Sequence, residues 1–191
     1  SPAGGVFTGP GVTGNQFNPA TAGVGTHEIT YSFMNGSGCS SSFVTSITVR
    51  SLPQLSVSVT DVSCFNAADG SATAAVSGGM APYTFSWNSN PVQVTPQAIG
   101  LRAGSYTVIV TDAAGCSASD EITVSQPAAL SATTFVTDVV CFGTSTGSVV
   151  INPSGGVAPY SISPAQTGLA AGSYVFTVTD AQGCMLAVPV T

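Results

Sequence analysis

Hydrophobic and polar residues alternate with a period of two in several short stretches of this chain. The clearest are LSVSVTDV (55–62), SATAAVS (71–77), YTFSW (83–87), SYTVIVTD (105–112) and EITV (121–124). Valine, threonine, tyrosine and phenylalanine are frequent in them, and glycine, proline, asparagine and aspartate separate them, as in β-strands joined by tight turns. No stretch of about 12 residues has the spacing of an amphipathic helix. The pattern therefore predicts an all-β protein with no helix longer than a turn or two.

The alternation also predicts which side chains face the interior. Because successive residues of a strand point to opposite faces, Tyr106, Val108 and Val110 share one face. Phe85 and Trp87 also share a face, and we expect them to form the aromatic centre of the core with Tyr106. Short alternating strands with frequent turns are typical of a two-sheet sandwich of immunoglobulin-like type.

A long internal repeat organises the chain. AGSYTVIVTDAAGC (103–116) recurs 68 residues later as AGSYVFTVTDAQGC (171–184), whereas VTDVSCF (59–65) and SGGMAPY (77–83) recur 77 residues later as VTDVVCF (136–142) and SGGVAPY (154–160). The later copy therefore lacks nine residues between the matched motifs. A length difference confined to one stretch indicates a loop or a short edge strand, where such changes are tolerated.

The repeat predicts three modules in a linear array. Residues 1–51 are interpreted as the C-terminal part of an immunoglobulin-like module, since 22–49 follow the plan of 103–124. Residues 52–127 form a full repeat, and 128–191 form a shorter repeat that is truncated at its end. Proline lies at both joins, where it cannot continue a β ladder. We expect the chain to be a segment of a longer array.

Composition excludes some classes of function. Charged residues make up 5% of the chain, there is no lysine, and Arg50 and Arg102 are the only strong cations. Binding to nucleic acid needs cations that neutralise phosphates, so it is not expected. No apolar run reaches about 18 residues, so no membrane insertion is expected. A surface of small uncharged polar residues suits a protein held outside a cell.

Cysteines occupy fixed positions in the repeats. Cys64 and Cys116 belong to the first copy, and Cys141 and Cys184 belong to the second. Two cysteines per module indicate structural disulfides in an oxidising compartment, and we expect all four to be oxidised. Two pairings are open. The bridges could lie within each repeat, or, if the first strand and the last hairpin end at opposite ends of the sandwich, they could join neighbours, such as Cys64 with Cys184. Cys39 corresponds to Cys116 and is expected to be free here.

Candidate chemistry is sparse. His27 is the only histidine, and no nucleophile motif accompanies it, so we predict no enzyme and no catalytic or cofactor-binding residues. Asp61, Asp112, Asp138 and Asp180 recur in both copies. Their oxygens could bind calcium at module joins, or they could cap turns and strand ends. No cofactor is predicted apart from this calcium candidate.

Together these motifs resemble the SprB repeat. The pattern Cys-Phe … Asp-Gly-Ser … Ser-Gly-Gly … Ala-Pro-Tyr … Trp … Gly-Leu-x-Ala-Gly-Ser-Tyr-x-Val-x-Val-Thr-Asp-x-x-Gly-Cys covers about 55–126 and 130–191. The second copy departs from it, because Thr146 replaces Asp69 and Trp87 has no counterpart. SprB repeats occur in very large cell-surface adhesins of gliding Bacteroidetes. The resemblance implies export by type IX secretion, attachment at the outer membrane, and a role in adhesion and gliding motility.

Two functions follow as hypotheses. The first is a structural or adhesive segment of a cell-surface adhesin, with neighbouring modules, surface polysaccharide or other cell-surface proteins as partners. The second is a carbohydrate-binding module of a secreted enzyme, with Tyr83, Phe85 and Trp87 as the platform for a sugar. Solvent exposure of Trp87 distinguishes them, because a sugar platform needs an exposed indole ring.

Overall fold

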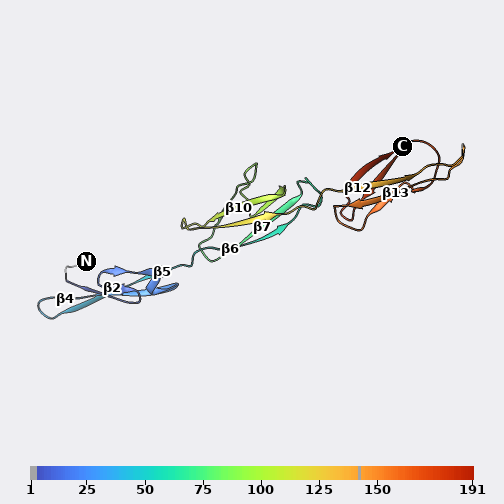
Figure 1. The fold of residues 1–191 in the computed structure, drawn as a ribbon. Coiled ribbons are helices and arrows are strands. Elements are labelled where there is room, and N and C mark those ends of the chain that lie inside the picture. The colour runs from blue at the N-terminus through green and yellow to red at the C-terminus, as the bar shows by residue number, and fades with distance from the viewer. Residues whose placement is uncertain (1–3, 142) are drawn as a thin grey trace. The chain divides into compact units, whose positions relative to one another are not determined.

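The computed structural model describes residues 4–141 and 143–191, so Phe142 of the repeated Cys-Phe motif and the first three residues lie outside it. β-Strands dominate the described chain (Figure 1). The single helix within these residues is α1 (Pro19–Ala22), which is one turn long. Asn18 caps it by accepting hydrogen bonds from the backbone nitrogens of Ala20 and Thr21. The prediction that no long helix forms is confirmed.

The chain divides into two compact units. One consists of the residues up to Leu55 together with Val76–Thr84 and Val110–Ala118, and the other of Ser56–Ala75, Phe85–Ile109 and Ser119–Thr191. The boundary therefore crosses the strands of the repeat at 52–127 rather than following the predicted module joins. The predicted boundaries at 51 and 127 stay predictions.

The first module, up to residue 51, has one main sheet. Its order is β1-β4-β5, and a small β2–β3 hairpin accompanies it. Ile29 on β4 is buried, whereas most of β5 is exposed. The strands are β1 (Val6–Thr8), β2 (Val12–Thr13), β3 (Gln16–Phe17), β4 (Gly25–Met34) and β5 (Ser40–Val49).

The middle repeat, residues 52–127, contains two three-stranded sheets. Their orders are β6-β7-β9 and β11-β10-β8. Trp87 is fully buried, and its indole nitrogen donates a hydrogen bond to the carbonyl oxygen of Thr95 at 3.0 Å. Val108 and Val110 are buried, whereas Ile109 between them is 48% exposed, so the predicted alternation on β10 is confirmed. The strands are β6 (Gln54–Thr60), β7 (Gly70–Ser77), β8 (Thr84–Trp87), β9 (Gln97–Leu101), β10 (Gly104–Thr111) and β11 (Ser117–Val124).

The last repeat, residues 128–191, follows the same plan. Its sheets have the orders β12-β13-β15 and β14-β16-β17. The nine missing residues fall in β14, β15 and the loop between them, since that loop spans 164–166 where the middle repeat has 88–96. The strands are β12 (Ser131–Thr137), β13 (Gly147–Ser154), β14 (Ser161–Ser163), β15 (Thr167–Leu169), β16 (Tyr174–Thr179) and β17 (Met185–Val190).

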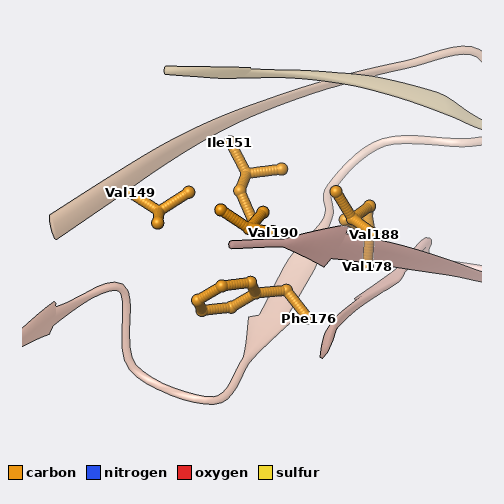
Figure 2. Packing of buried hydrophobic residues seen from close by; sticks show 6 residues of the cluster. All are labelled: Val149, Ile151, Phe176, Val178, Val188 and Val190. Carbon is orange, nitrogen blue, oxygen red and sulfur yellow. The ribbon is translucent and has the colours of Figure 1, made fainter. Parts of the chain in front are cut away.

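The core of the last repeat lies between its two sheets (Figure 2). Strand β13 of one sheet and strands β16 and β17 of the other supply its buried residues: Val149, Ile151, Phe176, Val178, Val188 and Val190. Phe176 is fully buried at the position that Val108 occupies in the middle repeat. A larger side chain on β16 therefore fills space in a repeat that has no tryptophan. The two sandwiches confirm the predicted fold class of all-β tandem modules.

Candidate functional site

The turn between β16 and β17 is built around the buried carboxylate of Asp180. Its Oδ1 accepts hydrogen bonds from the backbone nitrogens of Gln182 and Cys184, both at 2.9 Å. Its Oδ2 accepts one from the backbone nitrogen of Val157 at 2.9 Å, which ties this turn to the Ser-Gly-Gly turn. Burial alone raises the pKa of Asp180, but the backbone N–H donors outweigh burial and hold the pKa below its ordinary value. The carboxylate is therefore charged, and both of its oxygens accept hydrogen bonds from backbone nitrogens.

The middle repeat has the same turn. Asp112 is buried and accepts hydrogen bonds from the backbone nitrogens of Ala114 and Cys116 at 2.9 Å and of Met80 at 3.0 Å. Burial raises the pKa of Asp112, and the backbone donors again bring the pKa below its ordinary value. Both repeats thus present a cysteine from a turn that a carboxylate holds in one conformation.

The segment that enters the last repeat lies against the Ser-Gly-Gly turn. The backbone nitrogen of Gly156 donates to the carbonyl oxygen of Ala128 at 2.8 Å. A Cβ atom on Gly155 would lie 2.0 Å from the carbonyl oxygen of Ala129, so only glycine fits there. The hydroxyl of Tyr160 donates to the carbonyl oxygen of Gly155 at 2.6 Å and fixes the turn from the other side. We call residues 125–130 the linker.

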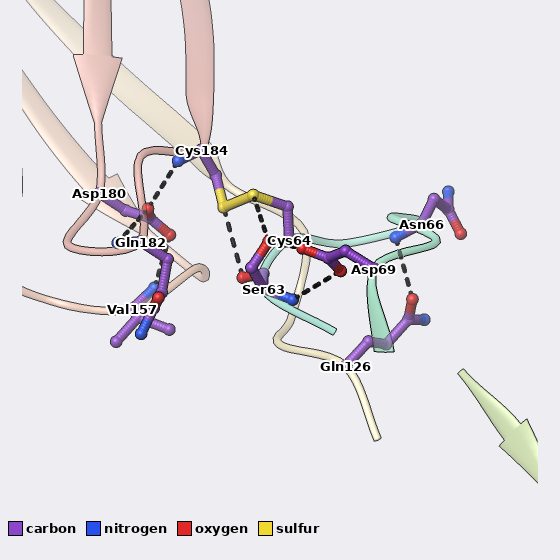
Figure 3. Close-up of a disulfide and its surroundings, with 9 residues drawn as sticks. All are labelled: Ser63, Cys64, Asn66, Asp69, Gln126, Val157, Asp180, Gln182 and Cys184. Atoms are coloured by element: carbon purple, nitrogen blue, oxygen red, sulfur yellow. Dashed lines mark hydrogen bonds between the residues drawn. A yellow bond between two sulfur atoms is a disulfide. The ribbon is translucent and has the colours of Figure 1, made fainter. Parts of the chain in front are cut away.

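The start of the linker is hydrogen-bonded to the loop that follows β6 in the middle repeat. The backbone nitrogen of Ser125 donates to Asp61 Oδ1 at 2.7 Å, and its carbonyl oxygen accepts from the backbone nitrogen of Val62 at 3.1 Å. The side-chain oxygen of Gln126 accepts from the backbone nitrogen of Asn66 at 3.0 Å (Figure 3). Both ends of the linker are therefore hydrogen-bonded to the repeat beside them.

The same loop holds Cys64. Asp69 accepts hydrogen bonds from the side chain and from the backbone nitrogen of Ser63, and these bonds lower the pKa of Asp69 below its ordinary value. A guanidinium nitrogen of Arg102 donates to the carbonyl oxygen of Asn66 at 2.8 Å. Asn66 has a φ of 62°, a left-handed conformation that asparagine tolerates better than most residues. The loop is thus fixed on both sides of the cysteine.

A disulfide joins this loop to the turn of the last repeat. Cys64 and Cys184 are bonded, with a Cα–Cα distance of 5.7 Å and a sequence separation of 120 residues (Figure 3). Pairing within each repeat is therefore wrong for these two cysteines, and the alternative pairing between neighbours is the one that forms. Cys116 and Cys141 are unpaired within the described residues, as is the exposed Cys39.

Strand direction explains why pairing within a repeat fails. In the last repeat, Cys141 follows β12. The end of β12 lines the same hollow as Tyr174 and Thr191. Cys184 lies at the other end of the β16–β17 hairpin, because Tyr174 pairs with Val190 and Thr179 with Met185. The length of β16 separates the two ends, about 20 Å at 3.3 Å per residue. A disulfide needs Cα atoms within about 7 Å of each other.

Comparison with protein families identifies the repeated unit. The SprB repeat model matches residues 56–92 and 133–164. The chain contains two SprB repeats. SprB repeats belong to cell-surface proteins. No match is found among curated proteins. Among the described residues, no helix is long and apolar enough to cross a membrane.

The four carboxylates proposed for calcium do not come together. Asp112 and Asp180 cap the Gly-Cys turns, and Asp61 holds the linker. Asp138, the counterpart of Asp61, is exposed. No group of three or more histidine, cysteine or acidic residues that could hold a metal ion occurs in the described part of the chain. In the two SprB repeats, Asp112 and Asp180 cap turns and Asp61 caps the linker. Calcium binding stays a prediction.

Sequence reasoning missed the residues that hold the linker. Ser63, Asn66 and Gln126 are ordinary polar residues in the sequence, and no spacing relates Gln126 to a loop 60 residues earlier. One signal was present. Asn66 directly follows the repeated Cys-Phe motif, where an asparagine favours a turn with positive φ. It could have indicated that the loop after Cys64 is tightly folded.

Proposed function

We propose that this chain is a structural and adhesive repeat segment of a large cell-surface adhesin that takes part in surface attachment and gliding motility. The observation that supports this most is the covalent joint between two SprB repeats. Because Cys64 and Cys184 belong to different repeats, a pulling force that passes from one repeat to the other is shared by the linker and the disulfide. Such a joint suits a protein that extends from a cell and bears load.

The proposal includes where the protein works and with what. The segment is exported by type IX secretion and attached at the outer membrane, an oxidising setting in which structural disulfides persist. Its partners are neighbouring modules of the same chain and surface polysaccharide or other cell-surface proteins. It is not an enzyme. With two strong cations in 191 residues, electrostatic attraction to nucleic acid is weak.

The alternative of a carbohydrate-binding module loses its platform. Trp87 has no exposed surface, and its indole nitrogen is already bonded to Thr95. Phe85 and Tyr83, which share its face, are half-buried. Aromatic side chains that stack on a sugar must offer an open ring face, and Trp87 offers none.

Cells of the source organism test the proposal. Antibodies against the segment should label intact cells, and labelling should not increase after the cells are permeabilised. In-frame deletion of residues 56–191 should reduce attachment to glass and gliding. The control strain carries Cys39→Ser, a change at an exposed, unpaired cysteine, and should behave as the parent. Labelling that requires permeabilisation, or normal attachment and gliding after the deletion, would reject the proposal.

A further inference from the structure

The end of the middle repeat that faces the linker is sealed by the residues that finish β11. Val124 is 1% exposed and Val62 is 4% exposed. Val124 packs so closely that a Cβ atom on Gly70 would lie 2.9 Å from its Cγ1. Ser125 then closes the edge, because its backbone bonds to Asp61 and Val62. A valine and a serine thus complete this end of the sandwich.

The corresponding end of the last repeat is open. A hollow of about 330 Å³ lies between the ends of its strands, lined by Asp138, Val139, Gly147, Tyr174 and Thr191 among others. These residues correspond to Asp61, Val62, Gly70, Tyr106 and Thr123 of the middle repeat. Thr123 directly precedes Val124. The hollow therefore lies at the position that Val124 and Ser125 fill in the middle repeat, and it is lined by equivalent residues. Val139 is only half-buried there, unlike its buried counterpart.

The loop beside the hollow presents a cysteine in the same way. Cys141 corresponds to Cys64 and is exposed. The backbone nitrogen of Thr144 donates to the carbonyl oxygen of Cys141 at 3.2 Å, as that of Ala67 does for Cys64 at 3.0 Å. Thr146 takes the place of Asp69 and accepts from the backbone nitrogen of Val140 at 3.5 Å. The described residues of this loop thus make the same two kinds of hydrogen bond as the loop that carries the bonded cysteine.

The partner for such a loop is also a repeated structure. The backbone nitrogens of Cys116 and Cys184 each donate to the carboxylate of their turn at 2.9 Å. Tyr83 and Tyr160 each donate to the first glycine of the adjoining Ser-Gly-Gly turn at 2.6 Å. Each SprB repeat therefore carries a loop cysteine after its first strand and a turn cysteine before its last strand.

We propose that the open end of the last repeat is a docking site for a further repeat of the same kind. A valine and a serine that continue β17 fill the hollow, and Asp138 accepts the N–H of that serine. Cys141 then forms a disulfide with the Gly-Cys turn of the added repeat. The two thiols lose two protons and two electrons to a disulfide oxidant, such as glutathione disulfide, which is reduced to two thiols. This inference concerns how repeats join and holds whether or not the segment is adhesive.

A short extension tests the hollow. The full chain is extended after Thr191 with Val-Ser-Gln, copying residues 124–126, and compared with the same chain carrying Asp-Ser-Gln. Burial of the valine should raise the thermal midpoint of the last repeat by about 5 °C or more, whereas the aspartate tail should give no rise. On an Asp138→Ala chain the Val-Ser-Gln tail should give a smaller rise. Equal midpoints for the two tails would overturn the proposal.

A long extension tests the bridge. A second copy of residues 124–191 follows Thr191, which raises the number of cysteines from five to seven. The protein is refolded with reduced and oxidised glutathione. The native bridge and the new one use four cysteines, so three free thiols are expected, and peptide mapping should find a Cys141–Cys184 linkage that the parent chain lacks. In a Cys141→Ser chain the added turn cysteine should stay free. The Cys64–Cys184 peptide is the internal control.

Two results of the experiment with the long extension would overturn the proposal. Five free thiols, with the native bridge alone formed, would show that Cys141 does not select the turn of an added repeat. A bond from Cys141 to another molecule would show that a second copy of the chain is its partner. The short tail needs no folding of its own, so the hollow is tested even if the added repeat does not fold.

Discussion

Asp180 Oδ1 lies 2.9 Å from the backbone nitrogen of Cys184, so the carboxylate that shapes the turn also positions the residue that is bonded to Cys64. The second oxygen of Asp180 holds Val157 of the Ser-Gly-Gly turn, against which the linker lies. One side chain therefore connects the two contacts by which the last repeat meets its neighbour: the linker and the disulfide.

Replacing Asp180 with asparagine should weaken both contacts. An amide keeps one acceptor oxygen but offers an NH₂ group in place of the other, so either Val157 or the pair Gln182 and Cys184 would face a donor. Asp180→Asn should lower the thermal midpoint of the last repeat and slow re-formation of the Cys64–Cys184 bond after reduction. Glu121→Gln removes the same charge at an exposed site and is the control. Equal midpoints in the two variants would contradict the assigned role.

Acid should destabilise the protein in a defined range. Asp69, Asp112 and Asp180 each have a pKa below the ordinary aspartate value of 3.8. A lowered folded-state pKa contributes stability above the unfolded-state pKa, and that stability is lost as the pH falls through the folded-state pKa. We expect thermal midpoints that are level from pH 7 to about pH 5 and that fall below about pH 4. In Asp180→Asn the thermal midpoint should fall less steeply with acid. A midpoint that rises on acidification would argue against the stabilising role of these carboxylates.

Much of the fold could be predicted because it is local. Alternation along one strand decides which residues face inward, and Val108, Val110 and Trp87 are buried as their spacing predicts. The internal repeat also indicated where the last repeat is shorter. Alternation along β16 does not predict why a phenylalanine stands at residue 176, because the space it fills depends on a different strand, where this repeat lacks a tryptophan.

The pairing of cysteines could not be decided in the same way. Their count and spacing are the same for bridges within repeats and between repeats. The decision depends on the direction of β12 relative to β16 and β17, which places Cys141 and Cys184 at opposite ends of the sandwich. Likewise, the bond between Asn66 and Gln126 joins residues 60 positions apart and follows no periodicity.

Loss of the bridge should expose the linker. In Cys64→Ser the linker is held by hydrogen bonds alone, so it should open more often. Elastase cleaves after small residues, and Ala128 and Ala129 lie in the linker. Cleavage there should be severalfold faster in Cys64→Ser than in the parent chain, with fragments identified by mass spectrometry. Cys39→Ser removes an exposed, unpaired cysteine and should leave the rate unchanged. A rate in Cys64→Ser equal to the parent's would mean that the bridge does not restrain the joint.

Trp87 should matter for stability and not for sugar binding. Trp87→Ala removes a fully buried side chain and should cost about 3–5 kcal/mol of unfolding free energy. Trp87→Phe should cost less, because it keeps a buried ring. It still leaves the Thr95 carbonyl oxygen without its donor, so some stability should be lost. Urea unfolding followed by circular dichroism measures both, and Phe135→Ala, at a residue 64% exposed, is the control. An unchanged stability in Trp87→Ala together with lost glycan binding would restore the carbohydrate-binding alternative.

Two glycines of the last repeat separate backbone strain from crowding by the linker. Gly155 has a φ of 75° and Gly183 a φ of 84°, so an alanine at either is strained by about 1–2 kcal/mol. A Cβ atom on Gly183 meets nothing within 4 Å, whereas one on Gly155 would lie 2.0 Å from the carbonyl oxygen of Ala129.

Gly155→Ala should therefore lose clearly more stability than Gly183→Ala. The linker must also move, which breaks the hydrogen bond from Gly156 to Ala128 and should speed hydrogen exchange of the Gly156 amide. Urea unfolding and amide exchange measure the two effects on the full chain. Equal losses of stability with an unchanged Gly156 exchange rate would show that the Ser-Gly-Gly turn does not seat the linker. Glycine at residue 155 would then serve its own turn alone.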